Sequence, residues 1–256
     1  MNPPKRPSPF FILPIIFILQ ALSGCNIPVV NSDPSEIPYH TKHFRIYYDP
    51  TVISPFEVEK ISILKESILE HVNEYLGTSF DQVITTTISD TISANTHFYA
   101  FTFQTHEQAR FAINDNGHEI AHVVSVHEWG NTTMNLLSEG VATAAQVRSY
   151  STVIYDYSST FWQAANRTAA VDTAMNHLYL NIVKNIFGYT YEEFIQAGAF
   201  VEFLRATYGI NNVAAWWHAT VNTSEDSPDA VFYSIFNDSL TNVIADFGMK
   251  TKEQFP

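Results

Sequence analysis

The segment "HEIAHVVSVHEWGNTTMNLLSEG", residues 118–140, is the part of the sequence that decides the fold. His118 and His122 are four residues apart, and Glu119 directly follows the first histidine. Positions i and i+4 lie on the same face of a helix, so both imidazoles can point at one atom. The spacing predicts a helix that carries a pair of metal ligands.

A further ligand is expected from the next helix. Glu139 lies 17 residues beyond His122 and begins the string "EGVATAAQ". The intervening "EWGNTTMN" contains Gly130 and two asparagines, residues that suit a reversal of the chain. Two antiparallel helices would bring Glu139 back to the histidine pair. Small residues after Glu139, beginning with Gly140, would let this helix pack closely on a neighbour.

Imidazole and carboxylate are ligands that zinc accepts readily, and a catalytic zinc keeps one position for water. Cys25 is the only cysteine of the 256 residues, so a thiolate site inside the folded domain is excluded. Glu119 points slightly away from the ligand face, where it could reach such a water without binding the metal. The alternative for each histidine taken alone is a hydrogen-bonded residue without a metal.

H-E-x-x-H followed at this distance by E-G-x-A resembles the gluzincin metallopeptidases, which include the thermolysin-like and aminopeptidase-N-like enzymes. The strings "HFRIYY", "GAFVEFLRATYG" and "VFYSIFNDSLTNVIADF" resemble the peptidase MA-like domains of bacteria, so the likeness covers most of residues 40–248. The resemblance implies that His118, His122 and Glu139 bind zinc and that Glu119 activates the water. A metzincin is excluded, because Ser125 and Glu128 stand where that pattern needs glycine and histidine.

The sequence departs from this family at the residue that stabilises the oxyanion. Relatives tend to carry tyrosine shortly before a "GSFV"-like string, and here Phe194 precedes "GAFV". We expect Tyr191, one helical turn earlier, to supply the hydroxyl, with Tyr189 and the more distant His177 as alternatives. No G-x-M-E-N string of the aminopeptidase branch occurs between residues 39 and 117, which favours an endopeptidase.

The N-terminal residues predict export and lipidation. Lys5 and Arg6 precede the apolar run "FFILPIIFILQAL", residues 10–22, which is too short to span a bilayer and is typical of a secretory signal. "LSGC" resembles the lipobox of bacterial lipoproteins and makes Cys25 the predicted lipidation site. We therefore expect a signal peptide at 1–24, a lipidated tether at 25–38 and a zincin-like metallopeptidase domain at 39–256. The protein would be anchored by lipid on the exported side of a bacterial cell envelope.

The charge balance argues against nucleic acid as a partner. The chain has 13 Lys and Arg against 26 Asp and Glu, a formal charge of −13. Loss of the signal peptide would remove two basic residues and no acidic one, which changes this charge to −15. Such a surface repels phosphate backbones and anionic headgroups. Membrane attachment would then come from the lipid, and the expected partner is a peptide or protein substrate.

Strand patterns precede helix patterns along the chain. Segments 42–49, 81–89 and 97–103 have strand character, and 54–77 is an amphipathic helix that begins at a Ser-Pro cap and ends at a glycine. Helices are expected afterwards at the histidine segment, 135–150, 158–186, 191–209, 228–236 and 239–247. This order predicts an α+β, zincin-like fold: a small N-terminal sheet with one helix, then the active-site helix and a mostly helical C-terminal part.

These patterns lead to a zinc-dependent peptidase as the first hypothesis. The second is a zincin-fold lipoprotein that binds or scaffolds without turnover, which the phenylalanine at position 194 favours. The third is a structural lipoprotein without metal, in which the H-E-x-x-H string arises by chance.

Overall fold

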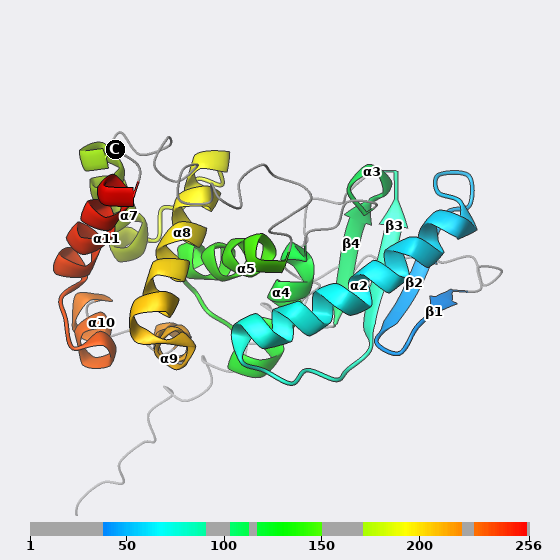
Figure 1. Ribbon diagram of the computed structural model, residues 1–256, viewed down its shortest axis with the longest axis horizontal. Coiled ribbons are helices and arrows are strands. Elements are labelled where there is room, and N and C mark those ends of the chain that lie inside the picture. Colours follow the sequence, from blue (N-terminus) through cyan, green and yellow to red (C-terminus); the bar gives the residue numbers. More distant parts are fainter. Residues whose placement is uncertain (1–37, 91–102, 113–116, 150–170, 222–227, 255–256) are drawn as a thin grey trace, which may run out of the picture. The chain divides into compact units, whose positions relative to one another are not determined.

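The computed structural model describes residues 38–90, 103–112, 117–149, 171–221 and 228–254 (Figure 1). The compact unit that holds all of the described elements covers Ile37–Pro256. The predicted signal peptide, the tether and Cys25 lie outside the described residues. No helix in the described ranges is both long and apolar enough to cross a membrane.

The described strands form one four-stranded sheet in the order β1-β2-β3-β4. These strands are β1 (Tyr39–His40), β2 (Phe44–Tyr48), β3 (Ile84–Ser89) and β4 (Gln104–Gln108). β1 pairs antiparallel with β2, whereas β2, β3 and β4 are parallel neighbours. The strands predicted at 42–49 and 81–89 are confirmed. The strand predicted at 97–103 falls almost entirely outside the described residues, and β4 starts directly after it.

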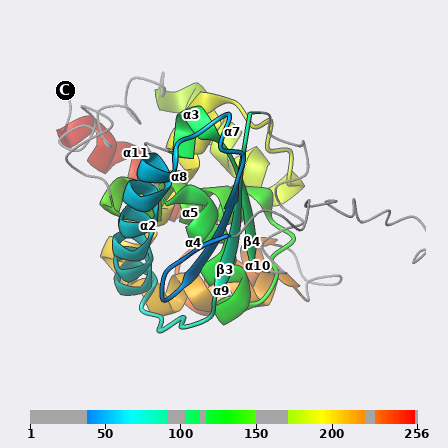
Figure 2. The same cartoon turned by 90° about the vertical axis from the view of Figure 1, so that its right-hand side faces the viewer.

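Helix α2 (Pro55–Leu76) connects β2 to β3 and covers one face of the sheet (Figure 2). Ser54 caps it in a capping box with Glu57, and Gly77 ends it in the left-handed conformation, as the sequence predicted. The buried residues of the strands alternate with more exposed ones, so one face is buried and packed, apolar on β2 and partly polar on β3 and β4. The other face carries polar side chains.

A buried ion pair ties α2 to the strand β4. Lys65, which is fully buried, places its Nζ 2.5 Å from Oε1 of Glu107. Thr105 donates from Oγ1 to the same carboxylate oxygen at 3.2 Å, and its hydroxyl lies 2.8 Å from that of Thr86 on β3. Breaking such a buried pair leaves an uncompensated charge, so the network fixes which residues of β4 face α2.

The rest of the described chain is helical, as expected. The helices are α3 (Ala109–Ala112), α4 (His118–Trp129), α5 (Asn135–Ser149), α7 (Val171–Lys184), α8 (Tyr191–Tyr208), α9 (Ile210–Val221), α10 (Pro228–Phe236) and α11 (Leu240–Gln254). The predicted helices at 135–150, 191–209 and 228–236 are confirmed within one residue. The helix predicted at 158–186 is described from Val171 onward, and α11 extends seven residues beyond its predicted end at 247.

Helix α9 was not predicted. Gly209 ends α8 with a φ of 87°, and α9 begins at the next residue, so no loop separates the two helices. The helix carries Trp216 and Trp217, both almost fully buried, into the core of the helical part. Trp216 packs edge-on against Phe200 and Phe232 at centroid distances of 6.5 and 5.1 Å.

The molecule is therefore a mixed α/β chain with a small sheet first and helices afterwards. Its sheet differs from the antiparallel sheet that is usual for an α+β fold, because three of its four described strands run parallel. The crossover through α2 explains the parallel pairing of β2 and β3, since a helix between two strands returns the chain to the end where it started.

Candidate metal centre

Helix α4 begins at the residue that carries the first imidazole. Gly117, its N-cap, has a φ of 81°, a left-handed conformation that suits glycine. A Cβ at this position would lie 2.6 Å from Cγ2 of Ile68 on α2. Position 117 thus requires glycine for two reasons: the left-handed backbone conformation and the close approach of α2. His118 and His122 follow on the same face of α4, one helical turn apart.

The turn between α4 and α5 is held from two sides. From α9, Trp217 donates its indole N–H to the carbonyl of Gly130 at 2.8 Å. Thr133 donates its hydroxyl to the carbonyl of Thr220 at 2.9 Å. From the segment after α7, Asn185 donates to the carbonyl of Thr133 at 2.8 Å and accepts from the backbone N–H of Asn135 at 3.0 Å. These bonds fix the direction in which α5 leaves the turn.

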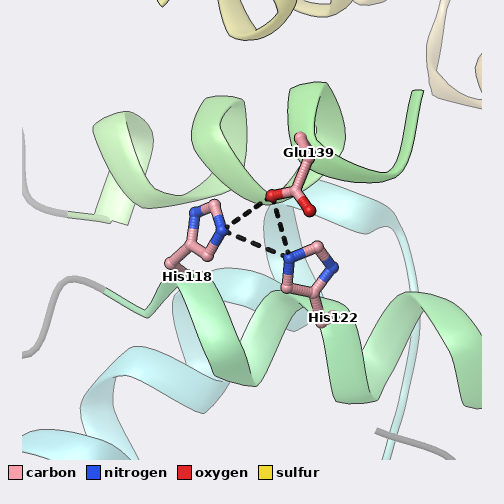
Figure 3. A group of neighbouring side chains, drawn as sticks. All are labelled: His118, His122 and Glu139. Atoms are coloured by element: carbon pink, nitrogen blue, oxygen red, sulfur yellow. Dashed lines mark hydrogen bonds and ion pairs between the residues drawn. The ribbon is translucent and has the colours of Figure 1, made fainter. Parts of the chain in front are cut away.

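Helix α5 runs antiparallel to α4, as the sequence predicted (Figure 3). The side-chain contacts show this direction. His118, at the start of α4, contacts Gln146 late in α5, whereas His122, one turn later in α4, contacts Ser138 early in α5. The other side of α5 packs on α8. There a Cβ on Gly140 would lie 2.8 Å from both the carbonyl oxygen of Ala197 and Cγ2 of Val201.

Three donor atoms converge between the two helices (Figure 3). Nε2 of His118 lies 3.1 Å from Oε2 of Glu139, and Nε2 of His122 lies 3.4 Å from the same oxygen. The two Nε2 atoms are 3.2 Å apart. Glu139 and His122 are buried, and His118 is partly exposed. This cluster, which we call the His-His-Glu group, is close enough to hold a metal ion.

A second set of contacts orients the two rings. Nδ1 of His118 lies 3.2 Å from Oε1 of Gln146, and Nδ1 of His122 lies 3.4 Å from Oγ of Ser138. The sequence analysis missed both partners. The available signal was spacing on α5: Ser138 is next to Glu139, and Gln146 lies seven residues after Glu139, about two helical turns along the same face.

The electrostatics of the group follow from its buried carboxylate. Burial lowers the pKa of His118, but the hydrogen bond that its ring donates to Glu139 and the charges of Glu119 and Glu139 outweigh this effect, so this pKa is raised. Glu119 also acts on His106 of β4. Burial lowers the pKa of His106, and the nearby charge of Glu119 partly opposes this effect. The Glu119 carboxylate is thus within electrostatic reach of both His118 and the strand β4.

The predicted oxyanion residues lie in and around the start of α8. Tyr191 is the first residue of α8, and its side chain lies outside the described part of the structure. Tyr189 has a φ of 56°, and its ring packs against Phe187 at a centroid distance of 5.1 Å. Phe194 places its ring 6.0 Å from that of His118. His177 is half exposed, with its Nδ1 3.8 Å from a carboxylate oxygen of Glu193.

Of these candidates, Tyr189 has a described electrostatic link to the His-His-Glu group. Burial raises the pKa of its phenol, and the charge of Glu139 raises it further. A phenol with a raised pKa keeps its proton at neutral pH and remains a hydrogen-bond donor. A left-handed backbone at a non-glycine residue costs free energy and is common at functional sites.

Comparison of the chain with protein-family models, with curated proteins and with solved structures found no match.

Proposed function

We propose that this chain is a zinc-dependent peptidase of the gluzincin type with a zincin-like fold. The observation that carries the proposal is the convergence of His118, His122 and Glu139 on one point, with Glu119 next to the first ligand. The H-E-x-x-H string predicted two of these ligands, and the third comes from a separate helix. A chance H-E-x-x-H string would have no reason to meet a buried carboxylate 17 residues further along the chain.

Zinc fits the spacing of the donor atoms. Zinc binds imidazole nitrogen and carboxylate oxygen at about 2.0–2.2 Å in a tetrahedron, which separates the donors by about 3.3–3.6 Å. The three separations in the His-His-Glu group are 3.1, 3.2 and 3.4 Å. Two nitrogens and one oxygen also leave a fourth tetrahedral position open, as in catalytic zinc sites.

In the proposed reaction Glu119 is the general base. Bound zinc would supply Lewis acidity, lowering the pKa of a coordinated water from about 15.7 towards 7 and polarising the scissile carbonyl. The Glu119 carboxylate would accept a proton from the attacking water and then deliver it to the leaving amine. Its position directly after His118, on a face of α4 turned slightly from the ligands, keeps it near the water without adding a fourth protein ligand.

Tyr189 is the residue that we propose to donate a hydrogen bond to the developing oxyanion. Its electrostatic link to Glu139, which shows that its phenol lies near the His-His-Glu group, supports this role. The segment that carries it is anchored on both sides. Asn185 binds the turn before α5, and Glu193 accepts hydrogen bonds from the backbone N–H groups of Gly188 and Thr190 at 3.1 and 3.0 Å.

Substrate and location remain part of the proposal. We propose an endopeptidase that acts on peptides or proteins outside the cytoplasm, held to a bacterial membrane by a lipid on Cys25. The acidic charge of the chain supports a partner that is neither nucleic acid nor an anionic lipid surface.

One observation favours a second candidate, a zincin-fold lipoprotein that binds without turnover. Phe194 occupies the position near which relatives carry the catalytic tyrosine, and its apolar ring packs beside His118. If neither tyrosine donates to the oxyanion, the site would bind zinc and hydrolyse poorly.

Glu119→Gln separates these candidates. The substitution keeps the size of the side chain and removes the proton acceptor, so we expect hydrolysis of a mixed peptide library to fall at least about 100-fold. Zinc content, measured by elemental mass spectrometry, should stay at one ion per chain. Glu128→Gln, at the exposed end of α4, is the matched control and should cleave at the wild-type rate.

Zinc content of three proteins tests the ligands themselves. The wild type should bind one zinc, and His122→Ala and Glu139→Ala should lose or weaken it, because each removes one of three donors. Zinc that is retained in full by Glu139→Ala would refute the gluzincin assignment. A wild type that takes up no zinc would refute the proposed function, and a zinc-bound wild type that cleaves no peptide would support the binding lipoprotein.

A further inference from the structure

Both histidines of the His-His-Glu group use their second ring nitrogen on the same helix. Gln146 faces Nδ1 of His118 at 3.2 Å, and Ser138 faces Nδ1 of His122 at 3.4 Å. Glu139, whose Oε2 lies between the two Nε2 atoms, stands between these residues in the sequence. One helix, α5, thus contacts every ring nitrogen of the pair.

We propose that Gln146 and Ser138 are positioning residues that hold both imidazoles with Nδ1 protonated and the Nε2 lone pair directed at the metal position, Gln146 being the stronger of the two. The inference rests on the proposed zinc site, but it concerns metal affinity and not hydrolysis. It assigns a task to two residues that no sequence motif identified.

The chemistry of the side chains supports this assignment for Gln146. A neutral imidazole carries one N–H and one lone pair, and the hydrogen bond made by one nitrogen determines which nitrogen keeps the proton. The amide oxygen of Gln146 only accepts, so Nδ1 of His118 must donate to it. If a metal binds the lone pair of Nε2, which faces Glu139 and His122, the proton on Nδ1 is the one that the ring keeps. Such partners of metal-binding histidines also fix the plane of the ring.

Ser138 exerts a weaker control. A hydroxyl can donate or accept, so it permits a protonated Nδ1 on His122 without requiring it. The separation of 3.4 Å is also longer than that of a strong hydrogen bond. We therefore expect the two partners to differ in effect, with Gln146 the larger.

The position of Gln146 adds a reason for its effect. It is half-buried near the end of the described part of α5, seven residues beyond Glu139, and it contacts the first residue of α4. His118 is the more exposed of the two histidines, so water competes most strongly for its Nδ1. A partner from the protein is worth most at the ring that water can reach.

The test is the affinity of the full chain, in detergent, for zinc ion in competition with a fluorescent chelator. Gln146→Leu keeps the bulk of the side chain and removes the acceptor, and we expect it to weaken zinc binding about 10–100-fold. Gln146→Glu offers a stronger acceptor and should bind at least as tightly as the wild type. Ser138→Ala should weaken binding less than Gln146→Leu. Gln108→Leu, an exposed glutamine of β4 bonded to the backbone of Asp90, is the matched control and should not differ from the wild type.

A second measurement separates positioning from folding. Nitrogen-15 spectra of the zinc-loaded chain report the Nδ1–H of His118, because Nε2 would then be bound to the metal. The wild type should show an Nδ1–H that exchanges slowly with water, and Gln146→Leu should show faster exchange, with an unchanged thermal midpoint. Zinc affinity within twofold of the wild type in Gln146→Leu, or an unchanged exchange rate, would overturn this inference while the zinc site stands. A wild type without zinc affinity would overturn both.

Discussion

Tyr189 combines a conformational cost with the chemical role that we propose for it. Its φ of 56° places a bulky side chain in the left-handed region, which glycine and asparagine occupy more readily. The surrounding contacts that hold it there are aromatic, from Phe187 and Phe194. Its exposed fraction of 47% leaves part of the ring open to an incoming molecule while Glu139 still affects its pKa.

Replacement of Tyr189 by phenylalanine tests its role with little change in shape. The ring and its contacts remain and the hydroxyl is lost, so we expect kcat to fall about 100–1,000-fold with zinc content unchanged. Peptide cleavage at saturating substrate is the measurement. Tyr191→Phe is measured beside it, and Tyr208→Phe, at the far end of α8, serves as the control. A large loss in Tyr191→Phe with full activity in Tyr189→Phe would return the role to Tyr191.

At the scale of elements, the geometry of the His-His-Glu group depends on the packing of α5 between α4 and α8. Its side towards α4 carries Glu139, and the glycine beside that residue faces α8. The absence of a side chain at Gly140 lets α8 approach to van der Waals distance. The position of Glu139 is therefore set by the packing of α8 against the opposite side of α5 as well as by the turn after α4.

Gly140→Ala is expected to destabilise the protein, although alanine is the better helix former. Helix propensity alone would stabilise the variant by up to about 1 kcal/mol. The added methyl group, however, would lie 2.8 Å from the carbonyl oxygen of Ala197, which belongs to helix backbone and cannot turn away. We expect a net loss of about 1–3 kcal/mol in the free energy of unfolding, measured with urea. A stabilised variant would show that α5 and α8 separate at little cost.

The elements that the sequence predicted best are those with local signals. Ser54 and Gly77 marked both ends of α2, and the H-E-x-x-H spacing marked α4. Helix α9 was missed because Gly209 signals an end and the next helix begins without an intervening loop. The parallel direction of β4 could not be read from its residues either. Strand direction depends on the crossover that precedes it and not on local pattern.

The candidate site divides in the same way. The histidine pair was predicted from spacing, because a helix fixes the relation between positions four apart. Glu139 was predicted from the turn residues between the two helices and from the resemblance to the gluzincins. Gln146 and Ser138 were not, since their role depends on the antiparallel register of α5 on α4. Asn185 and Thr220 hold the turn between α4 and α5, although they lie at least 50 positions away from it along the chain. No local sequence pattern can reveal contacts at this separation.

At the scale of the whole molecule, the stability of the folded state depends on the ionisation of carboxylates such as Glu193 and Glu66. Burial raises the pKa of Glu193, but hydrogen bonds from Thr190, Gly188 and Asn181 outweigh this effect and lower it below its usual 4.5. Glu66 behaves alike, since bonds from Thr41 and His43 outweigh burial. A pKa that is lower in the folded state contributes stability above the unfolded value, and this stability is lost as the pH falls through the folded value.

Glu193→Gln should therefore change the stability of the molecule in a pH-dependent way. At pH 7 we expect a loss of about 1–2 kcal/mol in the free energy of unfolding, because a neutral amide replaces a carboxylate that accepts several hydrogen bonds. The difference from the wild type should shrink as the pH falls below 4.5, where the unfolded carboxyl is protonated first and the folded one, whose pKa is lower, is protonated at still lower pH. Urea unfolding at a series of pH values measures it. Glu70→Gln, an exposed change on α2, should show no such trend, and a constant difference for Glu193→Gln would contradict this account.

The arrangement of α5 also bears on which changes of length the chain can accept. Three residues that face the histidines share this one helix, so a single-residue insertion between Glu139 and Gln146 would rotate everything after it by about 100°. The carboxylate would stay and the amide would swing off His118. An insertion before Asn135 would instead shift all three together, against the bonds from Asn185 and Thr220. A one-residue insertion in this part of α5 would therefore remove the contact of the glutamine and keep the His-His-Glu group, and on the proposed function it would leave a zinc site of lower affinity.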